Sequence, residues 1–177
     1  ASEQEKIKRF ELSNALMYFA RGIPVVYYGD EQGFTGDGGD RGAREDMMPS
    51  LTPDYNDNNL YGTDKTTKDD NFDQQHPLYK SFAEFVRVYH QHKALRQGKQ
   101  KVLSYSSDPG IFAFSRSLPN EAEYLVVFNS AKTNKGFKLE KAKTDHQVVY
   151  GDVTPEFTEG KLAMQLKPLS FAIVKVN

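Results

Sequence analysis

The chain has 177 residues, of which 38% are hydrophobic and 27% charged, and its formal net charge is −1. This balance excludes general electrostatic attraction to nucleic acid or anionic membranes, and the lack of cysteine excludes disulfides, thiol nucleophiles and thiolate metal sites. No stretch approaches the roughly 20 apolar residues that span a bilayer. We therefore expect a soluble protein without nucleic-acid or membrane partners, while the sequence leaves exported and cytoplasmic locations equally open.

The first predicted elements are a helix and a short buried strand. Residues 5–20 carry apolar side chains around most of a helical surface, which is typical of a helix packed inside a large protein. Gly22 and Pro24 end that pattern. Residues 25–28 (VVYY) then form an apolar run with no polar face, which predicts a strand buried on both sides.

A long polar loop follows the predicted strand. Residues 29–75 are rich in Gly, Asp and Asn and show little periodicity, and loops of that length are usually functional or disordered. A buried parallel strand that leads into such a loop is how α/β barrels build their active-site rims. One strand cannot form a barrel, and the opening residues ASEQEKIKRF read as the middle of a helix. We therefore interpret the chain as the C-terminal piece of a larger enzyme.

The second half of the chain changes from helical to strand periodicity. Pro77 opens a helix that ends near Gly98. Its predicted apolar stripe consists of Leu78, Phe82, Phe85, Val86, Tyr89 and Lys93. After Gly98 the period becomes two, with predicted strands at 101–105, 110–117, 123–129, 135–140, 146–150, 160–166 and 169–176.

This order of elements predicts an α+β segment with two parts. Residues 1–97 supply a helix, a strand, a long loop and a helix. Residues 98–177 form an antiparallel β-sandwich of about seven strands, because short strands separated by turn signals favour that architecture.

Asp40 and Arg44 are the first candidate binding residues. A carboxylate and a guanidinium held together can clamp neighbouring sugar hydroxyls, since one accepts and the other donates hydrogen bonds. The spacing of four residues equally describes a surface ion pair on a helical turn, and spacing alone favours that simpler interpretation. Asp30 and Glu31, at the end of the predicted strand, point to opposite faces and make a poor acid and nucleophile pair.

Other chemistries are not supported. The glycines at 36, 38 and 39 lack the lysine and Ser/Thr of a phosphate loop. The acidic segment 54–73 offers oxygen ligands for calcium but not EF-hand spacing, so a solvated loop is the favoured interpretation and no metal site is assigned. The sequence has neither an HExxH pattern nor a Gly-x-Ser-x-Gly elbow, so zinc-protease and serine-hydrolase chemistry are unsupported.

The sequence contains three recognisable phrases, ALMYFARGIPVVYYGDEQGF, DRGARE and FVRVYHQHKALRQG. Together they resemble the last portion of the α-amylase family of glycoside hydrolases. In that family a GIP-hydrophobic-hydrophobic-YYG-x-E strand is the eighth of a (β/α)8 barrel. A loop with an Asp and an Arg, the last barrel helix and a β-sandwich C-domain follow. The resemblance therefore implies that residues 1–97 are the last β/α unit of a TIM barrel. The segments GIFAFSR, YLVVFN and LSFAIVKV look like strands of the C-domain, so the resemblance covers nearly the whole chain.

The resemblance implies retaining hydrolysis or transfer at α-glucosidic bonds, with the three catalytic carboxylates upstream of residue 1. Asp40 and Arg44 match the family's sugar-contacting Asp/Arg pair, and Glu31 matches the acidic residue after YYG. The phrase GDRGARE departs from the commoner Asp-Pro-x-Asn-Arg form, which leaves Asp37 as a rival to Asp40. Calcium is possible in the parent enzyme, but no motif here supports it.

Two functional hypotheses follow. The first is a segment of an α-amylase-type enzyme acting on starch, maltooligosaccharides or related α-glucans, inactive alone because its catalytic carboxylates are elsewhere. Its partners are then the glucan and the remainder of the barrel, and the isolated segment is expected to self-associate or to leave residues 1–60 poorly ordered. The alternative is a non-catalytic carbohydrate-binding or structural β-sandwich module, which has no need of residues 1–97.

Overall fold

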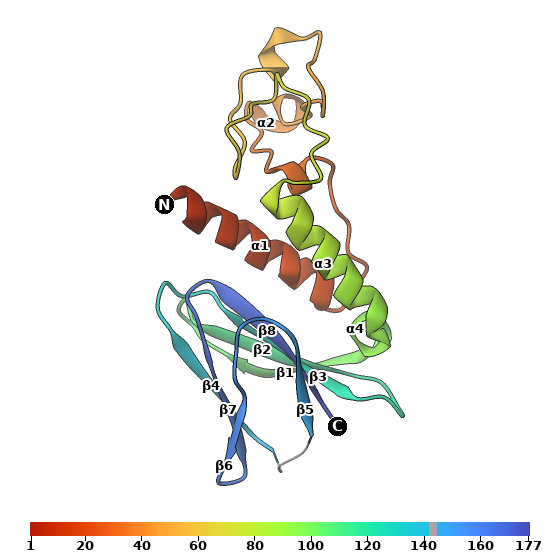
Figure 1. Ribbon diagram of the computed structural model, residues 1–177, viewed down its shortest axis with the longest axis vertical. Helices are drawn as coiled ribbons and strands as arrows, with labels where there is room; N and C mark the ends of the chain where they lie inside the picture. The colour runs from red at the N-terminus through yellow and green to blue at the C-terminus, as the bar shows by residue number, and fades with distance from the viewer. Residues whose placement is uncertain (142–144) are drawn as a thin grey trace. The chain divides into compact units, whose positions relative to one another are not determined.

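The computed structural model describes residues 1–141 and 145–177 and separates into two compact units. Unit 1 consists of residues 1–11 and 24–85, and unit 2 of residues 12–23 and 86–177. Figure 1 shows the helices and strands with the labels used below.

Helix α1 (Glu3–Phe19) begins two residues before the predicted start. The Ser2 hydroxyl accepts a 3.2 Å hydrogen bond from the Glu5 N–H, which satisfies one of the free donors of the first turn. Its last two turns belong to unit 2, where Ala15, Tyr18 and Phe19 are buried.

The second predicted helix is present but broken. It forms α3 (Pro77–Gln91) and α4 (Lys93–Gln97), separated by His92 in an extended conformation. The Arg96 guanidinium of α4 donates to the carbonyl oxygens of Tyr89 and His90, and so caps the C-terminus of α3. The predicted stripe was wrong at two positions, because Val86 and Lys93 are both exposed. Val88 is fully buried, whereas Val86 is exposed.

The expected strand at 25–28 does not form a strand in this chain. Residues 23–27 are irregular, and the side chains of Ile23 and Val25 are 89% and 75% exposed. A strand exists only where a neighbour accepts its ladder hydrogen bonds, and no described segment pairs with this one. Its apolar side chains therefore remain exposed on the surface.

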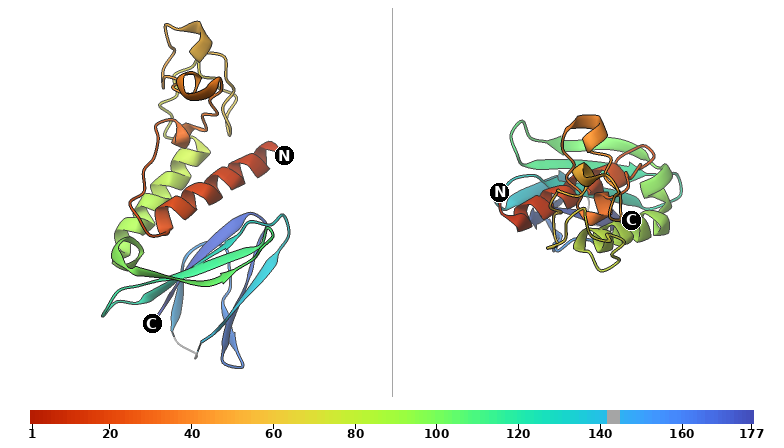
Figure 2. Two further views of the ribbon diagram at one scale, coloured as in Figure 1. Left: turned by 180° about the vertical axis from the view of Figure 1, so that it is seen from behind. Right: turned by 90° about the horizontal axis from the view of Figure 1, so that it is seen from above.

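Unit 2 contains the predicted antiparallel sandwich, with eight strands in its described residues instead of about seven (Figures 1 and 2). Strands β1 (Lys99–Tyr105), β2 (Ile111–Ser117), β3 (Glu123–Asn129), β5 (His146–Tyr150) and β8 (Ser170–Val176) form one sheet in the order β1-β2-β3-β8-β5. Strands β4 (Lys135–Glu140), β6 (Glu156–Thr158) and β7 (Lys161–Leu166) form the other in the order β4-β7-β6.

Strand β6 is not among the strands that the sequence predicts. It has three residues, too few to display a period of two. It pairs with β7 across a tight turn in which Glu159 and Gly160 have φ values of 53° and 75°. Two successive positive φ values characterise hairpin turns whose twist matches that of the strands.

The two sheets enclose one hydrophobic core. β7 follows the predicted alternation, with Leu162, Met164 and Leu166 buried. Residues from β2, β3 and β8 complete the core from the opposite sheet; these are Ile111, Ala113, Leu125, Val127, Val174 and Val176.

The other face of the five-stranded sheet carries a row of aromatic rings. The Phe171 ring stacks on Phe128 at 5.4 Å and on Tyr150 at 4.4 Å, with interplanar angles of 15° and 14°. Phe19 of α1 adds a tilted contact with Phe171 at 5.9 Å. The fully buried Arg116 guanidinium donates a 2.8 Å hydrogen bond to the Phe19 carbonyl oxygen. This face is therefore covered by α1 and its aromatic neighbours.

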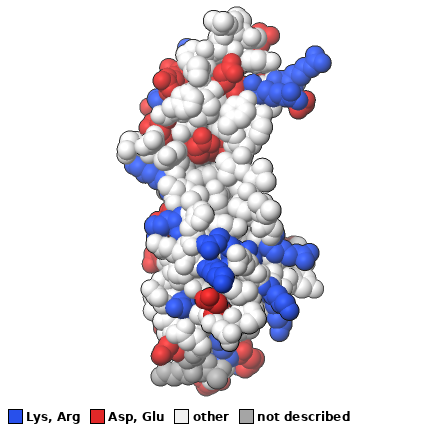
Figure 3. Space-filling view, turned by 90° about the vertical axis from the view of Figure 1, so that its right-hand side faces the viewer, with Lys and Arg blue, Asp and Glu red and all other residues white. Residues whose placement is uncertain are grey.

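Both positive and negative side chains are present on the face that Figure 3 presents, in agreement with the small net charge. Among the described helices, none combines the length and the apolar character that crossing a membrane would require.

Asn129 at the end of β3 holds the connection between the two sheets. Its Nδ2 group lies 2.8 Å from the Thr133 carbonyl oxygen and 2.8 Å from that of Lys167, and Leu166 O is 3.3 Å away. Its Oδ1 accepts from the Ala131 N–H at 3.0 Å. This fully buried amide therefore satisfies backbone groups that two different loops direct toward it.

We expect Asn129→Asp to lower the free energy of unfolding by about 3–5 kcal/mol, because a carboxylate cannot donate and would face buried carbonyl oxygens. Urea unfolding monitored by circular dichroism measures the change. Asn134→Asp, the same replacement at an exposed position, is the control and should change stability little. Equal effects of the two substitutions would contradict this role of Asn129.

Candidate functional site

The candidate site lies in the loop of residues 29–75, which is ordered by short turns. They are the 3-10 turn η1 (Asp30–Gln32), the one-turn helix α2 (Gly39–Gly42) and the 3-10 turn η2 (Pro53–Tyr55). An isolated β-bridge joins Asn59 to Thr66. Side-chain and backbone hydrogen bonds take the place of regular structure here, which buried backbone groups require.

Asp40 and Arg44 form an ion pair. Arg44 Nη2 lies 2.6 Å from Asp40 Oδ2, and the two side chains are 60% and 81% exposed. Exposed pairs at this spacing contribute little to stability. The bond joins one N–H group to one carboxylate oxygen, so the rest of the guanidinium fork and Oδ1 can bind a ligand.

Asp37 is the alternative to Asp40, and its backbone carbonyl oxygen lies close to Gly42 at the end of α2. A Cβ atom added to Gly42 would lie 2.4 Å from the Asp37 carbonyl oxygen, so this close approach requires glycine. Among the described ion pairs, Arg44 is joined to Asp40 and not to Asp37.

Glu31 and Asp30 lie in η1, directly after the exposed apolar segment. Glu31 Oε2 accepts a 3.1 Å hydrogen bond from the Gly29 N–H, and Asp30 Oδ2 accepts one from the Tyr27 N–H at 3.3 Å. Partial burial, assisted by the neighbouring Glu31 charge, raises the pKa of Asp30 against the opposing effect of the Tyr27 N–H. The two carboxylates therefore serve as caps of their own turn.

Tyr28, at the end of the apolar segment, has a pKa that is affected by charged residues of the Arg44 loop. Desolvation is the main cause that raises the pKa of Tyr28, and its hydrogen bond with Tyr27 adds to it. The Asp46 charge raises the pKa of Tyr28 further, while the Arg44 charge lowers it. Tyr28, Arg44 and Asp46 thus lie in one electrostatic neighbourhood, although they are 16 to 18 positions apart in sequence.

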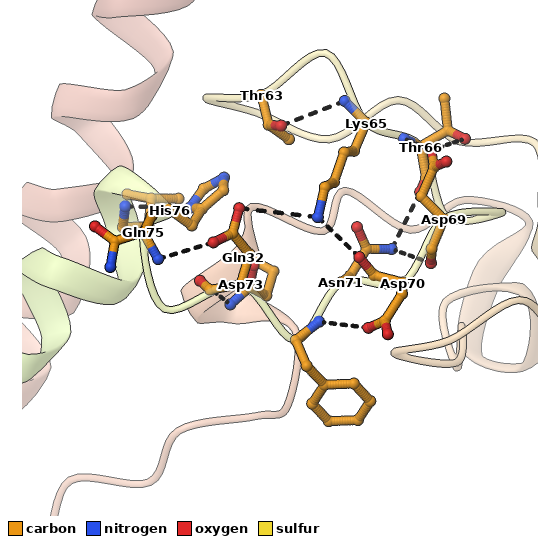
Figure 4. Close-up of polar contacts among 12 residues, drawn as sticks. Gln32, Thr63, Lys65, Thr66, Asp69, Asp70, Asn71, Asp73, Gln75 and His76 are labelled. Atoms are coloured by element: carbon orange, nitrogen blue, oxygen red, sulfur yellow. Dashed lines mark hydrogen bonds and ion pairs between the residues drawn. The ribbon is translucent and has the colours of Figure 1, made fainter.

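A polar network supports the loop from its other end (Figure 4). The buried Gln32 amide donates to the Asp73 carbonyl oxygen at 3.0 Å. Lys65 Nζ donates to the Asp70 carbonyl oxygen at 2.9 Å and lies 3.8 Å from Asp73 Oδ2. The composition of this stretch predicts a solvated acidic loop, and no spacing pattern in it indicates these contacts.

His76 joins this network to the start of α3. Its Nδ1 accepts from the Leu78 N–H at 3.2 Å, so the other nitrogen, Nε2, carries the proton and donates to the Tyr61 carbonyl oxygen at 2.9 Å. Burial, only partly opposed by Tyr61 and Asp73, lowers the pKa of His76. The neutral imidazole is the form that fits both bonds.

The pKa of His76 predicts a pH dependence of stability. Because it is below the unfolded value of about 6.5, the unfolded chain binds more protons near that pH, and stability falls as pH drops below about 6.5. This titration lowers the free energy of unfolding by at most about 1.4 kcal/mol for each pH unit. We expect His76→Asn to reduce the loss of stability between pH 7.5 and 5. Urea unfolding at several pH values measures it, and an unchanged profile would contradict the assignment. The exposed His90, replaced by Asn, is the control.

Two grooves lie on the sandwich, on unit 2. One of about 470 Å³ is lined by residues that include Lys138, Asp152 and Gln165, and one of about 580 Å³ by residues that include Ser104 and Lys135. Glu31, Asp40 and Arg44 line neither groove. Within the described ranges, no three His, Cys, Asp or Glu side chains converge as a metal site.

Comparison with known proteins identifies relatives of the chain. It is 42% identical over 134 residues to an α-amylase of Streptomyces lividans, which covers 75% of this chain and 15% of that protein. It is 31% identical over 112 residues to a β/α-amylase of Paenibacillus polymyxa, or 63% of this chain and 7% of that protein. No model of a protein family matches the chain.

Solved structures share the fold. The crystal structure of an α-amylase from H. orenii matches 97% of this chain and 36% of its own, with a TM-score of 0.72 and 15% identity. Amy13B of Eubacterium rectale matches 96% of this chain and 34% of its own, with a TM-score of 0.67 and 18% identity. The fold is thus that found in part of α-amylase family glycoside hydrolases.

The chain is an α-amylase homologue, as its three characteristic phrases predicted. It spans only a small part of the relatives that it matches.

Proposed function

We propose that this chain is the last part of a retaining α-glucoside hydrolase or transferase that acts on starch, maltooligosaccharides or related α-glucans. Residues 1–97 complete a catalytic barrel, and residues 98–177 are the C-domain. The nucleophile and the general acid of retaining chemistry are carboxylates that converge on one glycosidic bond. Neither is among the residues assigned here, so the chain alone is inactive and the remainder of the barrel is its partner in cis.

The exposed apolar segment carries this proposal. The large hydrophobic side chains of residues 23–28 are exposed, although burying each is worth roughly 1.5–3 kcal/mol. Contiguous exposed apolar surface marks an interaction site, and this segment has the composition of a strand buried on both sides. Neighbouring barrel strands, supplied by the rest of the enzyme, are the partners that would pair with it and cover both of its faces.

Asp40 and Arg44 contact the sugar in this proposal, with Glu31 nearby at the rim. The guanidinium fork donates to vicinal hydroxyls while the carboxylate accepts from them. Their exposure leaves both groups open to a ligand. They orient the substrate and take no part in proton transfer or nucleophilic attack.

We expect Arg44→Ala, in the full-length enzyme that contains this chain, to reduce kcat/KM for maltooligosaccharides by about 10- to 150-fold. This range corresponds to the loss of a charge-assisted hydrogen bond, about 1.5–3 kcal/mol. Arg41→Ala, at an exposed arginine three positions earlier, is the matched control and should leave kcat/KM unchanged. An unchanged kcat/KM for Arg44→Ala would exclude the sugar-contact role. Activity of the 177-residue chain alone would contradict the proposal that the catalytic carboxylates lie in the rest of the barrel.

We also expect the isolated chain to self-associate through residues 23–28, because this covers apolar surface in the absence of the barrel. Sedimentation velocity should show mass increasing with protein concentration, and Val25→Lys should shift the equilibrium toward monomer. Lys8→Glu, a charge change on an exposed helical residue, is the control. A chain that remains monomeric at all concentrations with protected amides at 25–28 would contradict the expectation.

A further inference from the structure

One buried side chain holds the segment that presents the Asp40–Arg44 pair. Every residue from 35 to 44 is exposed or partly exposed, whereas Glu45 is 1% exposed. The ion pair contributes little to the position of the segment, because both of its side chains are largely exposed to water. A carboxylate is almost never buried so completely unless a partner holds it. Glu45 is therefore the side chain that fastens this segment to the rest of the loop.

Exposure alternates along the backbone that follows α2. Arg44 and Asp46 are exposed, and Glu45 between them is buried. Such an alternation is typical of extended backbone, in which successive side chains point to opposite sides. Because Glu45 points into the loop, the preceding side chain, Arg44, is directed outward. The position of Glu45 thus determines where the Arg44 guanidinium lies.

Glu45 is joined to a well-held part of the loop through Asn58. Glu45 Oε1 accepts a hydrogen bond from Asn58 Nδ2. The Asn58 carbonyl oxygen accepts from the Thr67 N–H at 3.0 Å, and the Asn58 N–H donates to Thr67 Oγ1 at 3.1 Å. Thr67 is fully buried, and the bridge between Asn59 and Thr66 lies directly beside it. Asn58 therefore has a fixed place from which its amide holds Glu45.

The backbone after Glu45 is attached to the same part of the loop. The Asn71 N–H donates to the Met47 carbonyl oxygen at 2.9 Å. The side-chain amide of Asn71, which is 1% exposed, donates in turn to the carbonyl oxygens of Thr66 at 3.1 Å and Asp69 at 3.0 Å (Figure 4). Residues 45–47 are thus held by one side-chain bond and one backbone bond. Of these two bonds, the side-chain bond is the one that depends on which residue stands at position 45.

We propose that Glu45 is a positioning residue for sugar binding, which holds Arg44 in place through its hydrogen bond with Asn58. This inference rests on the sugar-contact role proposed above for Arg44. Glu45 is buried and touches no substrate atom. A guanidinium donates to sugar hydroxyls only within a narrow range of distance and angle, and a displacement of about 1 Å can reduce a rate by about 100-fold. A hydrogen bond that fixes the neighbouring backbone therefore contributes to substrate binding without contacting the substrate.

A purely structural role of Glu45 predicts a different result. If Glu45 only stabilised the loop, the loss of its bond would lower stability, and its effect on kcat/KM would not depend on Arg44. If Glu45 acts through Arg44, removing the bond affects kcat/KM only while the arginine is present. A double-mutant cycle separates the two roles, because it measures the coupling between two residues.

The test uses the full-length enzyme that contains this chain. We expect Glu45→Ala to reduce kcat/KM for maltooligosaccharides by about 3- to 10-fold, the equivalent of one hydrogen bond. Glu45→Gln, which keeps an oxygen acceptor for Asn58, should restore it. In the Arg44→Ala background Glu45→Ala should cause no further loss. Equal losses with and without Arg44, or an unchanged kcat/KM for Glu45→Ala, would overturn the proposal.

Asn58 tests the same bond from its other side. Asn58→Ala removes the donor at a partly exposed position, so it takes the place of Glu45→Ala if that variant does not fold. It should show the same loss and the same dependence on Arg44. Asn59→Ala, the same replacement at the exposed neighbour, is the control and should leave kcat/KM unchanged. Equal effects of the two replacements would contradict a role of the Asn58 side chain.

Hydrogen exchange measures the hold of Glu45 on this segment without reference to activity. The amides of Ala43 and Arg44 donate to the carbonyl oxygens of Gly39 at 2.9 Å and Arg41 at 3.2 Å. In the full-length enzyme, mass spectrometry of peptides that cover residues 39–47 should show exchange about 3- to 10-fold faster in Glu45→Ala. Exchange across residues 123–129 of the sandwich should not change. Unchanged exchange at 39–47 would overturn the positioning role while leaving the sugar contact of Arg44 intact. An unchanged kcat/KM for Arg44→Ala would instead overturn the sugar contact, and the positioning role with it.

Discussion

Burial of the five-stranded sheet on both faces is the constraint on which unit 2 depends. The three central strands β2, β3 and β8 pack their core residues against the smaller sheet, and on the other face the Phe171 ring of β8 contacts Phe19 of α1. A sheet that is apolar on both faces needs two covers. The final turns of α1 provide the second cover, and Arg116 fastens the helix end through the Phe19 carbonyl oxygen. The sandwich therefore requires a helix from much earlier in the chain.

The smaller sheet, in contrast, is buried on one face only. In β4 and β7 one face is buried in the core and the other faces solvent, so large apolar residues alternate with small or polar ones. Asn129 joins the two sheets with a side chain, at a place where backbone groups of two loops would otherwise be buried without partners. Directional hydrogen bonds thus determine the connections, while hydrophobic burial determines the layers.

In unit 1 the loop that holds the candidate site is built almost without regular structure. Gly33 has a φ of 73° and a backbone so close to Tyr61 that an added Cβ would lie 2.3 Å from its carbonyl oxygen. Buried polar side chains such as Gln32 and His76 then connect the turns. Such a loop presents Asp40 and Arg44 on a supported surface while the apolar segment before it remains open. This combination fits a site completed by further chain, as we propose for an α-amylase-type enzyme.

The sequence alone determined both long helices and seven of the eight described strands, because hydrophobic periodicity is a local signal. The family resemblance also rested on contiguous phrases. Only the tertiary structure decided which face of α3 is buried, at Val88 instead of Val86, and that β6 forms from three residues against β7. It also left residues 25–28 without strand partners and buried Glu45 beside Asn58. These outcomes depend on neighbours distant in sequence, for which a single side chain carries no local signal.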